Sequence, residues 1–88
     1  MKYAITFARK ALKDTSNVKS AHLDSNVKAL LLIIAENPYQ TPPPYERLVG
    51  DLHGLYSRRI NIQHRLVYQV READHTVAIL SMWSYYEF

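Results

Sequence analysis

Residues 56 to 71, YSRRINIQHRLVYQVR, constrain the fold more than any other stretch, because they have the pattern of a β-hairpin. Strand-forming residues lie on both sides of a tight turn at Asn61-Ile62-Gln63. Farther along, the residues around Val77 are apolar at both alternating positions, which is typical of an internal strand covered on both faces. The C-terminal half is therefore expected to form three strands, at about Leu55–Ile62, His64–Arg71 and His75–Trp83.

The N-terminal half predicts one more strand and two helices. Tyr3–Phe7 is short, apolar and β-prone, and the stretch from Ala8 to about Ser20 is rich in the helix formers Ala, Lys and Leu. A break is expected near Ala21-His22, and Asn37-Pro38 ends the second helix, since a residue before proline disfavours helical geometry. The apolar face of that helix is formed by Leu23, Val27, Leu30, Leu31 and Ile34.

These elements predict one α+β domain over residues 1–88, with an N-terminal helical hairpin packed on a mostly antiparallel sheet. Between the helices and the hairpin lies NPYQTPPPYERLVGDLHG, which contains three consecutive prolines and both glycines of the chain. This composition predicts a loop that is long for so small a domain, and such loops are often functional.

The chain has no cysteine, so it needs no disulfide framework and a reducing compartment is permitted. We expect a cytoplasmic protein, because the N-terminus lacks the pattern of a signal peptide and the run Ala29–Ala35 is too short to cross a bilayer. The net charge of +3 is mild. Its distribution is more informative, because Arg58, Arg59 and Arg65 crowd into the predicted hairpin, as in many phosphate-binding proteins.

The turn at residues 61–63 places Arg59 directly opposite Arg65, with both side chains on one face. Opposed like charges destabilise a sheet by a few tenths to about 1 kcal/mol, so fold stability does not ask for this pair. A phosphate between the two guanidinium groups would turn repulsion into two charge-assisted contacts. In the alternative interpretation, the arginines splay into water or pair with an acidic residue, the candidates being Glu46, Asp51 and Glu87.

Other kinds of site have no pattern in this sequence. The four histidines have no metal-ligand spacing, and there is no glycine-rich phosphate loop, cysteine nucleophile or nucleophile elbow. We therefore expect neither a metal nor a cofactor. The remaining set of glutamate, arginine and tyrosine suits metal-independent cleavage of RNA.

The stretches PPPYE, YSRRI and HRLVY, followed by WSYYEF, resemble the Txe/YoeB toxins of the RelE superfamily over essentially the whole chain. That family comprises bacterial type II toxin–antitoxin endoribonucleases. The resemblance implies a microbial RNase-like fold and metal-independent cleavage of mRNA in the ribosomal A site. It also implies inhibition by a cognate antitoxin whose disordered acidic tail covers the toxin, and it allows self-association.

Residue by residue, the resemblance assigns the catalytic acid to Glu46 and the active-site arginines to Arg59 and Arg65. The catalytic tyrosine falls on Tyr86, with Tyr85 beside it. Glu46 would accept the 2′-hydroxyl proton, the arginines would stabilise the phosphorane, and a tyrosine would protonate the leaving oxygen.

Two positions depart from the family pattern. Val49 occupies the place of a lysine, and Tyr85 occupies the place of a histidine that is commonly the general acid. These departures keep a second hypothesis open, in which the protein is a catalytically weak ribosome-binding or RNA-binding inhibitor, or an antitoxin co-repressor.

Further residues have alternative roles. Arg58 and Trp83 are candidates for RNA binding, since aromatic rings stack on unpaired bases. His64 is an alternative acid, but it shares strand parity with Leu66 and Tyr68, which favours a structural role. Glu46 could instead be a loop carboxylate paired with an arginine, and the C-terminal aromatic residues could serve packing.

Overall fold

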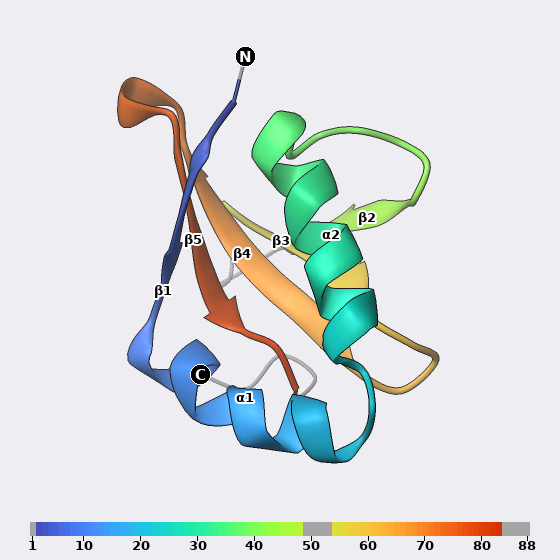
Figure 1. Cartoon of the computed structure of the whole chain (residues 1–88). Helices are drawn as coiled ribbons and strands as arrows, with labels where there is room; N and C mark the ends of the chain where they lie inside the picture. Colours follow the sequence, from blue (N-terminus) through green and yellow to red (C-terminus); the bar gives the residue numbers. More distant parts are fainter. Residues whose placement is uncertain (1, 49–53, 84–88) are drawn as a thin grey trace.

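The computed structural model describes residues 2–48 and 54–83. Within these ranges the chain forms two α-helices, a 3₁₀-helix (Glu72–Asp74) and one five-stranded sheet with the strand order β1-β5-β4-β3-β2 (Figure 1). The helices are α1 (Arg9–Ser20) and α2 (Asp24–Glu36). The strands are β1 (Ala4–Phe7), β2 (Tyr45–Arg47), β3 (Leu55–Arg59), β4 (Arg65–Arg71) and β5 (Thr76–Ser81).

The sheet is mostly antiparallel, as the sequence predicts, because only the edge strand β1 runs parallel to its neighbour β5 among the described strands. Both helices pack on one face of this sheet, and α2 lies across β4 and β3 in Figure 1. The core between them consists of Ala11, Val18, Val27, Leu30, Ile34, Ile60, Leu66, Tyr68, Val77, Ile79 and Met82.

Strand β5 confirms the interpretation of its two apolar faces. It is an internal strand, and Val77 and Ile79 are fully buried in the helix-facing core. Ala78 and Ser81 lie on the opposite face and are also buried; they share that face because the register between β4 and β5 shifts by one residue between Val67 and Tyr68. The apolar residues at both parities of this strand are therefore explained by burial on both sides.

The turn between the helices lies where the sequence predicts it. His22 adopts a left-handed conformation (φ 59°), and the amide of Leu23 donates to the carbonyl of Val18 at 2.9 Å. This pattern terminates α1, satisfies one of its last carbonyls and turns the chain into α2. α1 continues without a break through Thr15-Ser16-Asn17.

Two features differ from the predicted elements. The proline-rich segment contains β2, a three-residue strand that pairs with β3, so this part of the segment is sheet rather than loop. The hairpin strands are also shorter, ending at Arg59 and beginning at Arg65. Asn61 closes the connection, because its side-chain oxygen accepts hydrogen bonds from the amides of Gln63 and His64, at 2.9 and 2.7 Å.

A carboxylate ties the first strand to the segment that follows α2. Glu72 accepts hydrogen bonds from the hydroxyl of Tyr3, at 3.0 Å, and from that of Tyr39. These bonds lower the pKa of Glu72, with the Tyr39 hydroxyl as the main cause. Burial and the same carboxylate raise the pKa of both tyrosines.

Among the described residues, none of the helices has the length and apolar composition that a membrane span requires.

Candidate active site

The predicted opposition of two arginines is confirmed. Arg59 of β3 pairs in register with Arg65 of β4, and Glu46 of β2 pairs in register with Ser57 of β3. Directly paired residues share a face, as do residues two apart on a strand. All four side chains therefore lie on the face of the sheet opposite α1 and α2.

These four residues, together with Pro44 and Tyr45, line a hollow of about 250 Å³. Glu46 and Arg59 are exposed at its rim, whereas Arg65 is only 8% exposed. The guanidinium of Arg65 also lies 3.4 and 3.5 Å from the backbone carbonyl oxygens of Asn61 and Ile62 in the hairpin turn, which makes these two contacts long and weak. The hollow thus combines one carboxylate with two permanent cations, a set that can hold a phosphate and accept a proton beside it.

The structure brings together three of the five predicted catalytic residues, namely Glu46, Arg59 and Arg65. The other two, Tyr85 and Tyr86, lie outside the described residues, as does Val49. In the part of the chain that the structure describes, no group of three or more histidine, cysteine or acidic side chains converges.

Arg58 lies on the other face, and the prediction that it contacts RNA is wrong. Its side chain is 1% exposed, because it shares the core-facing parity of Tyr56 and Ile60. The guanidinium donates to the hydroxyl of Tyr68 at 3.1 Å and to three carbonyls of the proline-rich segment. Those carbonyls belong to Pro38, Gln40 and Pro43, at 3.0, 2.9 and 2.7 Å.

This buried cation has an indirect role in the site. By fastening the proline-rich segment behind β3, Arg58 fixes the chain that leads directly into β2 and Glu46. The guanidinium also lies over the ring of Tyr45, 5.1 Å from its centroid. Burial raises the pKa of Tyr68, and the adjacent Arg58 charge opposes that rise.

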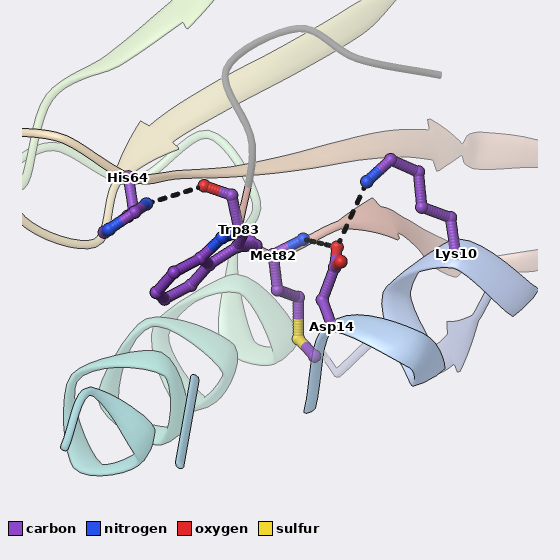
Figure 2. A network of polar contacts seen from close by, with 5 residues as sticks. All are labelled: Lys10, Asp14, His64, Met82 and Trp83. Carbon is purple, nitrogen blue, oxygen red and sulfur yellow. Dashed lines mark hydrogen bonds and ion pairs between the residues drawn. The ribbon is translucent and has the colours of Figure 1, made fainter. Parts of the chain in front are cut away.

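The end of β5 is held by two side chains from distant elements (Figure 2). Asp14 of α1, paired with Lys10 at 3.5 Å, accepts a hydrogen bond from the amide of Met82 at 3.0 Å. Nδ1 of His64 donates to the carbonyl of Trp83 at 2.9 Å, and the two rings stack with centroids 3.8 Å apart. We call these two contacts the β5 clamp.

The clamp supports the structural role expected for His64, whose neighbour Arg65 lines the hollow. One face of the Trp83 ring is covered by that histidine, and base stacking by this residue remains a prediction. Asp14 was missed by the sequence interpretation, although a signal existed. It lies on the same helical stripe as Ala11 and Val18, so an acid there is directed into the core.

Comparison with known proteins identifies what this chain is similar to. The family model for YoeB-like toxins of bacterial type II toxin–antitoxin systems matches residues 7–86. Toxin YoeB of Synechocystis sp. (strain ATCC 27184 / PCC 6803 / Kazusa) is 38% identical over 61 residues, which cover 69% of this chain and 69% of that protein.

Two solved structures from Staphylococcus aureus are also similar. One is the heterotetrameric YoeB-YefM toxin-antitoxin complex, at 31% identity and a TM-score of 0.79, with 98% of this chain and 100% of that chain covered. The other is the YoeB dimer, at 32% identity and a TM-score of 0.78, with the same coverage.

Proposed function

The chain belongs to the YoeB-like toxins of bacterial type II toxin–antitoxin systems, and we propose that it inhibits translation by cleaving mRNA in the ribosomal A site. The observation that supports this most is the in-register pair Arg59 and Arg65, which shares a hollow with Glu46. Two directly opposed arginines repel each other and so destabilise the sheet. A phosphate between them would replace that repulsion with two charge-assisted hydrogen bonds.

The proposed reaction uses the RNA's own 2′-hydroxyl as nucleophile. Glu46 accepts its proton while the bond from O2′ to phosphorus forms, and Arg59 and Arg65 stabilise the charge that develops on the phosphorane. The bond from phosphorus to O5′ then breaks, and Tyr86 or Tyr85 protonates the leaving oxygen. The products are a 2′,3′-cyclic phosphate and a 5′-hydroxyl, and no step requires a metal or a cofactor.

The β5 clamp supports the proposed part of the tyrosines. In the sequence, Tyr85 and Tyr86 follow Trp83 by two and three residues. Trp83 is fixed against His64, and the next residue, Arg65, lines the hollow. From this fixed tryptophan, we propose that a C-terminal tyrosine reaches the hollow.

The proposed partners follow from the same surface. A cognate antitoxin with a disordered acidic tail would be attracted to the arginine pair and would compete with mRNA for it. The solved structures of the Staphylococcus aureus relatives include a YoeB-YefM complex and a YoeB dimer, so we also propose self-association. A toxin that acts on ribosomes and mRNA would work in the cytoplasm.

The test is cleavage of a defined mRNA on purified ribosomes programmed with it, followed by mapping of the new 5′ ends. We expect cuts inside the A-site codon with the unmodified chain and none with Arg59→Ala. The second candidate function is an inhibitor that binds without cutting. It is favoured by Val49 and Tyr85, which occupy the places where the family resemblance leads us to expect a lysine and a histidine. Blocked translation with intact mRNA would establish that second function.

A further inference from the structure

Ser57 forms part of the hollow, and its hydroxyl has no assigned role. The residue is 2% exposed and lies directly opposite Glu46 in the sheet register. Its Oγ is buried without a hydrogen-bond partner among the residues described here. Most buried polar groups in native proteins are paired, so an unpaired hydroxyl on a residue that lines a polar hollow calls for an explanation, and a ligand in that hollow can supply one.

The position of Ser57 narrows the choice of ligand atom. Ser57 precedes Arg59 by two residues on β3 and lies on the same face, directly opposite Glu46 of β2 and next to the arginine pair. Ser57 is buried whereas Glu46 and Arg59 are exposed, so Ser57 forms part of the floor of the hollow, and its hydroxyl makes no hydrogen bond to Glu46. Since no described residue supplies an acceptor, a molecule that enters the hollow can supply it.

Building on the proposed cleavage of RNA, we propose that the Ser57 hydroxyl donates a hydrogen bond to a non-bridging oxygen of the scissile phosphate. The two arginines would hold the phosphate from one side, and the hydroxyl would contact it from the floor of the hollow. This neutral donor would help to orient the phosphate. The two arginine side chains are long and can bind it in several geometries, whereas a hydrogen bond from a short side chain on a strand has few alternative geometries.

The chain provides a closely matched control. Ser81 is also fully buried, and its hydroxyl likewise lacks a partner within the described residues. It lies on the same face, because Ser57 and Ser81 both pair with Val67 from opposite sides. Ser81 is not among the residues that line the hollow. Replacing either serine with alanine removes one buried, unpaired hydroxyl, but only one of the two faces the proposed substrate.

The experiment measures single-turnover cleavage on programmed ribosomes, together with thermal melting. Ser57→Ala should cleave roughly 10- to 100-fold more slowly, as expected for loss of a hydrogen bond to a charged group, with an unchanged or higher Tm. Ser81→Ala should cleave at the unmodified rate, and Ser57→Thr should retain most activity because it keeps the hydroxyl.

A phosphorothioate at the scissile linkage gives a readout that a structural role would not move. Sulfur accepts hydrogen bonds poorly, so replacing the oxygen that Ser57 contacts should slow cleavage by the unmodified chain. For that diastereomer, the loss of rate caused by sulfur should be smaller in Ser57→Ala, which has no hydroxyl to lose a bond.

If the unmodified chain cuts mRNA and Ser57→Ala cuts equally fast, this inference is overturned while the proposed function stands. If both alanine variants lose activity and melt early, the serine is structural and the inference is again overturned. If the unmodified chain leaves mRNA intact, the proposed function fails and this inference fails with it.

Discussion

The adjacent residues Arg58 and Arg59 should have separable roles, and the same conservative substitution should reveal them. Arg58→Lys keeps the charge but removes the planar fork of donors, and Arg59→Lys makes the same change on the opposite face of β3. Because Arg58 is buried and Arg59 is exposed, we expect the first change to affect stability and the second to affect cleavage.

The magnitude follows from the contacts. Arg58 donates four hydrogen bonds, to the Tyr68 hydroxyl and to the carbonyls of Pro38, Gln40 and Pro43. A single ammonium group cannot span these acceptors, and losing one or two bonds from a charged donor costs about 2–5 kcal/mol. For a domain of this size, 1 kcal/mol shifts Tm by about 4–8 °C, so Arg58→Lys should lower Tm by roughly 10–40 °C.

Thermal melting by circular dichroism measures this change, and hydrogen exchange should show faster exchange at the amides of Tyr39 and Gln40. Arg59→Lys should melt within a few degrees of the unmodified chain. It should cleave mRNA at least about tenfold more slowly, because lysine cannot form two parallel hydrogen bonds to a phosphate. The reasoning is refuted if Arg58→Lys melts normally but no longer cleaves mRNA, because Arg58 would then contact the substrate.

Glu46→Gln should reduce single-turnover cleavage by about 10²–10⁴-fold while ribosome binding, measured by co-sedimentation, stays nearly unchanged; loss of binding instead would make Glu46 a positioning residue. Asp14→Ala should lower stability by about 1–3 kcal/mol, because it leaves the buried amide of Met82 without its acceptor, and denaturant unfolding measures this. Glu72→Gln should melt below the unmodified chain at neutral pH. Since the pKa of Glu72 is lowered on folding, its contribution exists above the unfolded pKa and is lost as pH falls through the folded value, so the two melting curves should converge in acid. A difference in Tm that persists in strong acid would contradict that cause.

The hairpin and its arginine pair were predictable because strand alternation and turn length fix register with few residues. Once Ile60 and His64 closed the turn, the positions of Arg59 and Arg65 followed from counting. β2 was not predictable from pattern, because three residues after a run of prolines carry too little periodicity to indicate a strand. Its pairing depends instead on the neighbouring strand β3, which is a tertiary effect.

The same counting could have corrected the interpretation of Arg58. It shares parity with Ile60, so the alternation that directs Arg59 into the hollow directs Arg58 into the core. The sequence interpretation instead grouped the arginines by charge, because a buried arginine is uncommon without a carboxylate partner. No carboxylate was needed here, since backbone carbonyls and a tyrosine hydroxyl serve as acceptors.

The proline-rich segment explains why a cation is buried there. Prolines have no amide hydrogen, so the segment offers carbonyl acceptors with few donors of its own to pair with them. The carbonyl of Pro38 accepts from both Tyr68 and Arg58, and the same guanidinium reaches Pro43, directly before the last proline that precedes β2. An arginine has five N–H donors in a rigid fork, and lysine or glutamine has fewer, so arginine is the side chain suited to this set of acceptors.

The order of the segment that positions Glu46 therefore depends on Arg58, while Arg59, the next residue, lines the hollow on the other face. A substitution of the core-facing arginine should therefore lower stability, and it should affect cleavage only together with that loss, through the position of Glu46.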